Sequence, residues 1–219
     1  MYRRLLIVAL ATLAVAVSLL AGCVPARTQA PVPAAPLGAE TSAEATAAAA
    51  PPVAVRIVTD KGDIDLELYP DKAPATVANF VTLAKSGFYD GIRVHRVDRG
   101  FVVQAGDPLT KGLSAKELLA ILARRAANAP RADDPAIGAG GPGWTIPLEV
   151  SDLVHDRGVI AMARSTDPDS AGSQFYITLG DAHHLDGGYA VFGKVIAGMD
   201  VADSLAVGDG IRSVRVVGE

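Results

Sequence analysis

The chain has 219 residues and a formal net charge of −4, from 20 Lys and Arg residues against 24 Asp and Glu residues. This length fits one domain with extensions, and a mildly acidic chain lacks the basic surface that unspecific nucleic-acid binding requires. The single cysteine excludes an intrachain disulfide and a cysteine-based zinc cluster. We therefore expect no nucleic-acid partner.

The first segment has the pattern of an export signal. Arg3 and Arg4 precede the apolar run Leu5–Leu20, which is shorter than the roughly 20 residues of a membrane-spanning helix. The run closes on Leu20-Ala21-Gly22-Cys23, which resembles the lipobox of bacterial lipoproteins. That resemblance implies a signal peptide at residues 1–22, a lipid on Cys23, and an exported protein anchored to a membrane of the bacterial cell envelope. An uncleaved anchor, or an ordinary signal with a chance cysteine, is the alternative.

Residues 23–52 are rich in Ala, Pro, Thr and Glu and show no apolar periodicity. Such a segment cannot bury enough surface to offset the entropy that ordering would cost. We therefore expect a disordered tether that holds a folded domain away from the membrane. The folded domain is expected at residues 53–219.

Within that domain, apolar side chains mostly alternate with polar ones, which is typical of β-strands. A helix is predicted over Pro74–Ser86, because Pro74 suits a first helical turn and Gly87 suits a left-handed stop. Many short strands with two or three helices predict an antiparallel barrel or sandwich. The predicted strands are Val53–Val58, Ile64–Leu68, Arg93–Val97, Phe101–Gln104, Val159–Ala163, Gln174–Thr178, Ala190–Val195 and Ser213–Val217.

A glycine run, Gly138–Gly143, matches the letters of a dinucleotide-binding fingerprint. That fingerprint binds a pyrophosphate at the start of a helix. Here Pro142 and Trp144–Pro147 cannot open a helix, so we expect a plain glycine loop and no cofactor.

A hydrolase triad could be drawn from Ser173 with His155 or His184 and Asp181 or Asp186. Ser173 stands in Ala-Gly-Ser-Gln and lacks the Gly-x-Ser-x-Gly turn that exposes a nucleophilic serine. We therefore do not expect nucleophilic catalysis.

Four neighbouring side chains could also be imagined as metal ligands. Adjacent histidines in a loop lack the helical spacing that presents two imidazoles to one ion, so we expect no metal site. The four residues are Asp181, His183, His184 and Asp186.

Several blocks of sequence remain, and they occur in a fixed order over nearly the whole of residues 53–219. They are Val94–Val97, Gly100–Pro108, Met162–Ser165, Ser170–Thr178 and His184–Val195. In this order they resemble the cyclophilin-type peptidyl-prolyl cis–trans isomerases. The resemblance implies a mainly β fold, a closed eight-stranded antiparallel β-barrel capped by two helices, with a substrate groove on its outside. It also implies that Arg96 is the catalytic residue.

The same resemblance implies a set of substrate-binding residues. Two of them depart from the common family pattern: His184 stands where many members have Trp, which puts cyclosporin-type binding in doubt, and Arg164 stands where Asn is commoner. The expected substrate-binding residues are Phe101, Val102, Gln104, Ala163, Arg164, Gln174, Tyr176, His184, Leu185 and Tyr189.

A further departure is an insertion at about residues 109–137, where many family members have only a few residues. Ser114–Glu117 has the form of a capping box and predicts a helix to about Ala127. Leu118, Leu119 and Leu122 are expected to form its apolar patch. This helix either packs on the rim of the barrel, which we expect, or acts as a lid or partner site.

Together these features predict a monomeric isomerase that acts on proline-containing polypeptides and accelerates the folding of exported proteins. The alternative is a non-catalytic module or chaperone that binds proline peptides on the same fold.

Overall fold

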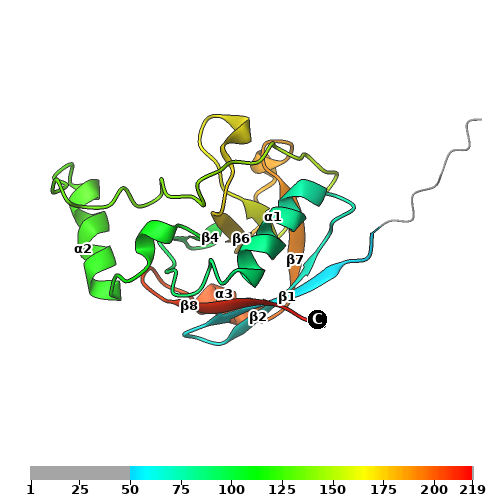
Figure 1. Ribbon diagram of the computed structural model, residues 1–219, viewed down its shortest axis with the longest axis horizontal. Coiled ribbons are helices and arrows are strands. Elements are labelled where there is room, and N and C mark those ends of the chain that lie inside the picture. Colours follow the sequence, from blue (N-terminus) through cyan, green and yellow to red (C-terminus); the bar gives the residue numbers. More distant parts are fainter. Residues whose placement is uncertain (1–49, 219) are drawn as a thin grey trace, which may run out of the picture. The chain divides into compact units, whose positions relative to one another are not determined.

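The structure, a computed structural model, describes residues 50–218 (Figure 1). The predictions for the signal peptide, for nearly all of the tether and for Cys23 lie outside the described residues. Within residues 50–218, none of the helices has the length and apolar character that crossing a membrane requires.

The predicted strands are confirmed, with ends that shift by a few residues. They form one antiparallel sheet in the order β3-β4-β6-β5-β7-β2-β1-β8. The strands are β1 (Val53–Thr59), β2 (Asp63–Leu68), β3 (Arg96–Asp98), β4 (Val102–Ala105), β5 (Val159–Met162), β6 (Phe175–Thr178), β7 (Val191–Ala197) and β8 (Ile211–Val216).

The sheet curls but does not close, so the prediction of a closed barrel is wrong. β3 and β8 stand at the two ends of the strand order. Between them runs one isolated bridge, from Arg93 to Gly210, and the Val94 N–H donates to the Asp209 carbonyl over 2.9 Å. The segment before β8 is a turn, in which the Asp209 N–H donates to Ala206. A turn offers no extended edge for a strand ladder, so the sheet stays a half-barrel.

Three helices accompany the sheet in the described part of the chain: α1 (Pro74–Lys85), α2 (Ala115–Ala126) and α3 (Met199–Ser204). α1 begins with Pro74, as predicted, and it packs against β8. α3 contacts β2. The sequence pattern did not single out α3, because six residues are too few to show a helical period.

The main core lies between α1 and the sheet (Figure 1). The Phe80 ring of α1 has its centroid 5.1 Å from that of Tyr89, 5.5 Å from Phe175 and 5.3 Å from Phe192. Fully burying a side chain of this kind contributes roughly 1.5–3 kcal/mol. Because side chains alternate along a strand, Phe175 joins this core while the next residue, Tyr176, joins a second cluster on the opposite face of β6.

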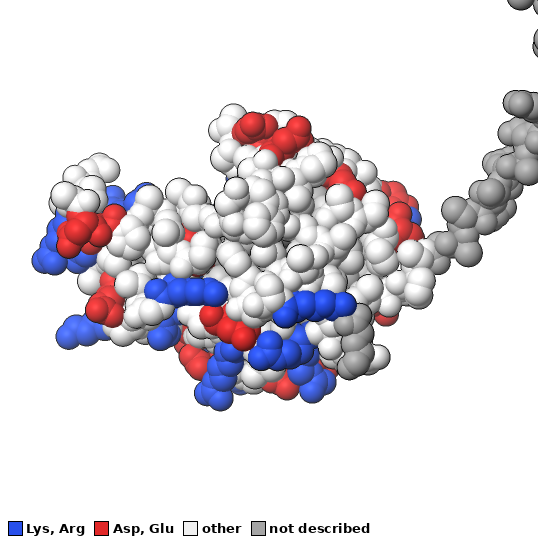
Figure 2. Space-filling model, in the orientation of Figure 1, with Lys and Arg blue, Asp and Glu red and all other residues white. Residues whose placement is uncertain are grey.

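Opposite charges are interspersed over the part of the surface formed by β1, β2 and β8 (Figure 2). The Arg56 guanidinium lies 2.6 Å from the Asp65 carboxylate, and Arg212 lies 3.0 Å from Asp60. Paired charges of both signs leave no continuous basic stripe on this part of the domain.

The insertion contains the predicted helix, α2, and its capping box is present. The Ser114 side chain accepts a hydrogen bond from the Glu117 N–H, and the Glu117 carboxylate accepts one from the Ser114 N–H. The predicted apolar patch is partly wrong. Leu118 and Ile121 are the buried residues of α2, whereas Leu119 is 49% exposed. Positions three residues apart share a helix face, and Leu119 lies about 100° away from Leu118.

Candidate active site

The β3–β4 hairpin presents a cation and an amide side by side. Arg96 is paired with Gln104 in the antiparallel register, so both side chains point to the same face. The Arg96 side chain is 51% exposed, and its nearest carboxylate, that of Asp98, is 3.8 Å away. No described residue accepts a hydrogen bond from its guanidinium. An exposed ion pair at this distance is weak, so the N–H groups of Arg96 can bind a substrate.

His95, the residue just before Arg96, has a buried imidazole that favours its neutral form. His95 is buried, and neither ring nitrogen has a hydrogen-bond partner among the described residues. Burial lowers the pKa of His95 and outweighs the nearby Asp107 charge, which acts in the opposite direction; the Arg96 charge adds a smaller lowering. The neutral form is therefore favoured beside the guanidinium.

Two glutamines form the floor of the groove next to Arg96. The Gln104 Nε2 donates to the Gln174 Oε1 over 3.0 Å, and the Gln174 Nε2 donates to the carbonyls of Gly138 and Gly140 over 3.0 and 2.8 Å. The Gly138–Gly143 run thus accepts hydrogen bonds from a side chain, and no helix follows it. As predicted, the run is a loop that does not lead into a helix.

A cavity of about 590 Å³ continues the groove beyond the glutamines. It brings together Gln104, Gln174, Ala163 and Arg164, which the sequence had placed in the binding site. Its rim also contains Trp144, whose side chain is 51% exposed and whose Nε1 donates to the Asn79 Oδ1 over 3.0 Å. Trp144 was not predicted as a site residue, because a lone Trp in a glycine-rich loop shows no pattern that would place its side chain.

An apolar wall lies on the other side of Arg96. Val102 and Tyr176 are buried there, and Phe101, Leu185 and Tyr189 pack against them. The His184 ring stacks on Phe101, with 5.4 Å between centroids and 25° between planes. The Arg96 Cζ lies 5.7 Å from the centroid of the same Phe101 ring. The structure thus brings the predicted pocket residues together next to the predicted catalytic cation.

Arg164, the second departure from the family pattern, holds one wall of the groove. Its Nε donates to the Gly188 carbonyl over 2.9 Å, and its Nη1 donates to the Ser165 carbonyl over 2.9 Å. Its Cζ lies 4.6 Å from the centroid of the Tyr189 ring, which is a cation–π distance. Arg164 therefore ties the segment before Tyr189 to the end of β5.

The rejected hydrolase triad proves to be half present. The His155 Nδ1 lies 2.7 Å from the Asp186 Oδ1, but its Nε2 lies 2.9 Å from the hydroxyl of Tyr176. Ser173 is elsewhere, and its hydroxyl donates to the Gly106 carbonyl over 2.7 Å. Ser173 bonds to backbone, His155 bonds to Asp186 and Tyr176, and His184 stacks on Phe101. The structure therefore does not bring these candidates together as a triad.

His155 lies between Asp186 and Tyr176, and the pKa values of both of these neighbours are shifted. The hydrogen bond from the His155 side chain, followed by that from its backbone N–H, lowers the pKa of Asp186. Burial raises the pKa of the Tyr176 phenol, which therefore stays a hydrogen-bond donor.

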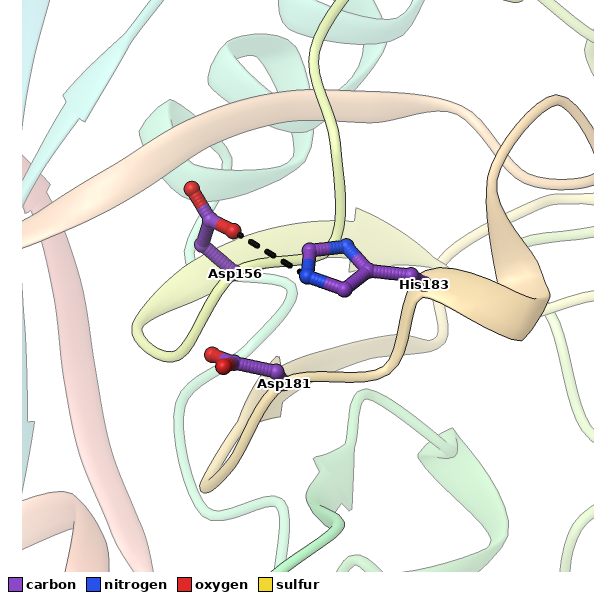
Figure 3. A group of neighbouring side chains, drawn as sticks. All are labelled: Asp156, Asp181 and His183. Carbon is purple, nitrogen blue, oxygen red and sulfur yellow. Dashed lines mark ion pairs between the residues drawn. The ribbon is translucent and has the colours of Figure 1, made fainter.

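Some of the candidate metal ligands do meet, joined by a residue that the sequence analysis did not consider. Asp156, Asp181 and His183 each offer a ligand atom, and these atoms lie within 4.8 Å of one another (Figure 3). All three residues are exposed, and exposed acidic groups do not by themselves define a metal site. Of the other two candidates, His184 stacks on Phe101, and Asp186 lies 2.7 Å from the His155 ring and 3.4 Å from the Nδ1 of His183.

The sequence model of a family described as "Cyclophilin type peptidyl-prolyl cis-trans isomerase/CLD" matches residues 54–217. The chain belongs to the cyclophilin family. This cyclophilin is 38% identical over 164 residues to the peptidyl-prolyl cis-trans isomerase B of Bacillus subtilis, covering 74% of this chain and 96% of the relative. It is 41% identical over 162 residues to a peptidyl-prolyl cis-trans isomerase of Helicobacter pylori, covering 72% and 83%.

Solved structures agree. A cyclophilin-type isomerase from Cryptosporidium parvum superposes with a TM-score of 0.61 at 26% identity, covering 77% of this chain and 99% of that one. The same Cryptosporidium protein crystallised in the presence of the dipeptide Ala-Pro gives a TM-score of 0.60 at 27% identity, covering 76% and 99%. The predicted family and the predicted activity, peptidyl-prolyl cis–trans isomerisation, are therefore confirmed. The roles of the individual site residues stay predictions.

Proposed function

We propose that this cyclophilin isomerises X–Pro bonds of exported proteins, with Arg96 as its catalytic residue, and that a lipid on Cys23 anchors it to the bacterial cell envelope. The observation that carries the catalytic part is the placement of Arg96. Its guanidinium has no hydrogen-bonding partner among the described residues, and its Cζ lies 5.7 Å from the ring of Phe101, which packs against the apolar cluster of Val102 and Tyr176.

The mechanism follows from the amide bond. Rotation about C–N costs about 18–20 kcal/mol, because the nitrogen lone pair is delocalised into the carbonyl. In the twisted state that lone pair is localised on nitrogen and accepts a hydrogen bond. A guanidinium N–H aimed at it binds the twisted state more strongly than the planar state, which is the requirement for catalysis. Each ~1.4 kcal/mol of this preference gives about a tenfold faster reaction.

The neighbouring residues supply binding rather than chemistry. The apolar wall of Phe101, Val102, Tyr176 and Leu185 holds the proline ring, while Gln104 and the backbone at Ala163 hold the residues around it. The Ala-Pro dipeptide present with the Cryptosporidium relative supports a proline-containing substrate for this groove. No cofactor takes part in this reaction scheme.

A proline-tetrapeptide assay tests the catalytic part. The purified domain should turn over the peptide and should also accelerate a protein refolding reaction limited by proline isomerisation. A non-catalytic binding module would bind the same peptide, measured by NMR titration, without accelerating its exchange. Binding without turnover would therefore contradict the proposal.

The anchoring part rests on sequence. The apolar run Leu5–Leu20 ends in the lipobox-like Leu20-Ala21-Gly22-Cys23, and Cys23 is the single cysteine. Expressed in a bacterium, the wild-type chain should fractionate with membranes and begin at a lipid-modified Cys23 by mass spectrometry. Cys23→Ser should leave an unlipidated, unprocessed precursor. A wild-type protein that starts at another residue and stays in the aqueous fraction would contradict this part.

A further inference from the structure

A continuous chain of polar side chains runs behind the apolar wall of the groove. Asp186 Oδ1 lies 2.7 Å from the His155 Nδ1, and the His155 Nε2 lies 2.9 Å from the Tyr176 hydroxyl. His155 is 0% exposed and Tyr176 is buried. The mechanism above uses the Tyr176 ring but assigns no role to its hydroxyl, to His155 or to Asp186.

One arrangement of protons satisfies each member of the chain. Asp186 accepts from the backbone N–H of His155 as well as from its ring, both at 2.7 Å. A neutral His155 with its proton on Nδ1 donates to that carboxylate and accepts at Nε2 from the Tyr176 hydroxyl. His155 and Tyr176 are buried, where polar groups without partners are costly, whereas Asp186 is exposed. The two bonds therefore hold the imidazole and the phenol in one geometry, with Asp186 as their anchor at the surface.

The chain joins two elements that build the pocket. Tyr176 belongs to β6, whereas Asp186 directly follows His184 and Leu185, two predicted pocket residues. The Ala182 N–H also donates to the His155 carbonyl over 2.7 Å. His155 therefore contacts both ends of the pocket segment 182–186 and the pocket ring on β6.

Tyr189, another predicted pocket residue, packs against both His155 and Tyr176. Its ring meets Tyr176 edge-on with centroids 5.9 Å apart, and it meets His155 edge-on at 6.4 Å. Arg96 lies on β3 and makes none of these contacts. Removing the polar chain should therefore disturb the pocket and leave the guanidinium in place.

We propose that His155 is a positioning residue: through Asp186 and the Tyr176 hydroxyl it fixes the width of the proline pocket. The proline ring is held in that pocket in the cis, trans and twisted states alike. A contact that binds ground and transition states equally affects KM and leaves kcat unchanged. This inference rests on the proposed use of the groove for substrate.

Tyr176→Phe is the first variant, because it removes the hydroxyl and keeps the ring. We expect KM for a proline tetrapeptide to rise by about threefold to tenfold, the range that one hydrogen bond of ordinary strength gives, with kcat within about twofold. The matched control is Tyr69→Phe, which removes a hydroxyl bonded to Glu67 away from the groove. It should leave KM unchanged.

A double-mutant cycle then separates positioning from simple packing. His155→Leu alone should raise KM as Tyr176→Phe does, and the double variant should be no worse than His155→Leu. If His155→Leu does not fold, Asp186→Ala replaces it in the cycle. Independently, the ¹⁵N shifts of the wild-type His155 ring should show a protonated Nδ1 and an accepting Nε2.

An unchanged KM in Tyr176→Phe, a loss confined to kcat, or fully additive effects would each overturn the proposal. The dissociation constant of the same peptide is measured for every variant by NMR titration. A wild-type protein that binds without turnover would overturn the proposed catalysis, whereas the variant dissociation constants would still decide the role of His155.

Discussion

Two arginines, Arg93 and Arg96, stand three residues apart and have opposite surroundings. Arg93 is partly buried: its Nη1 donates to the Gly208 carbonyl over 2.6 Å, and its Nε donates to the Leu113 carbonyl. Its backbone N–H donates to Thr110. Arg96 is half exposed, with one distant carboxylate at 3.8 Å. The N–H groups of Arg93 are therefore bonded within the fold, whereas those of Arg96 are available to a substrate.

The contacts of Arg93 show how the insertion is attached to the sheet. Leu113 and Thr110 belong to the segment that leads into α2, and Gly208 precedes β8. Arg93 therefore joins the insertion to the open seam of the sheet, which is the gap between β3 and β8 where no strand ladder forms. Arg96 begins β3 on the other side of the same short segment and faces the groove. Substitutions on the insertion side should affect stability, and those on the groove side should affect activity.

The largest effect is expected within the insertion. Leu118 is 0% exposed and packs with Ile121 and Ile137, so Leu118→Ala should lower the free energy of unfolding by about 2–3 kcal/mol. Turnover of a proline tetrapeptide should stay within about twofold, because the buried face of α2 packs on Ile137 and Val207 and α2 lines no part of the cavity in the groove. Urea denaturation measures the first quantity. The matched control, Leu119→Ala on the exposed face of the same helix, should cost less than about 0.5 kcal/mol. A loss of peptide turnover in Leu118→Ala would instead favour a lid.

The next largest effect is expected for Arg93, whose hydrogen bonds stabilise the fold. Arg93→Ala removes hydrogen bonds from a charged group to two carbonyls, and we expect the free energy of unfolding to fall by about 2 kcal/mol. Arg93→Lys should recover part of this loss, because an ammonium lacks the planar fork. Peptide turnover below the melting transition should be nearly normal. Low activity in a fully folded Arg93→Ala protein would contradict the division between the two sides.

The reverse result is expected for Arg96. Arg96→Ala should lower kcat/KM for a proline tetrapeptide at least tenfold, or about 1.4 kcal/mol of transition-state stabilisation. Its free energy of unfolding should change by less than about 0.5 kcal/mol, since the side chain is exposed. Arg96→Lys should rescue activity only in part. A folded Arg96→Ala variant with full activity would remove the proposed mechanism.

The smallest effect is a pH dependence of the insertion. Hydrogen bonds from the Arg124 side chain and then from the Arg131 backbone lower the pKa of Asp134 to about 2. An unperturbed Asp has a pKa of about 3.9, so this carboxylate stabilises the fold above that value. The contribution is lost as the pH falls through the folded pKa of about 2. Amide exchange in α2 should accelerate over that range.

Asp134→Asn should accelerate the same exchange already at pH 5 and remove its acid dependence. Asp133→Asn, at the exposed neighbouring position, is the control and should leave the exchange unchanged. Equal effects of the two substitutions would show that the bond from Arg124 to Asp134 does not hold the insertion.

Local sequence patterns were sufficient to predict the strands, α1 and α2, and the family resemblance indicated which residues line the groove. Alternation of apolar residues, the proline at the first position of α1 and the capping box at Ser114 are local patterns, and local patterns can be recognised in the sequence alone. The ordered blocks from Val94 to Val195 were sufficient to indicate the family, and they contained Arg96 and the apolar wall.

The hydrogen-bond partners of the polar residues could be seen only in the folded structure. The open seam beside Gly210, the burial of Ile121 in place of Leu119, and the bond from His155 to Tyr176 all depend on partners far away in the chain. A lone histidine such as His155 is not part of a periodic pattern. Sequence spacing also does not show that Arg93, and not Arg96, donates its hydrogen bonds to backbone carbonyls. Hydrogen-bond partners and burial are properties of the folded arrangement, so they become visible only when the strands are in place.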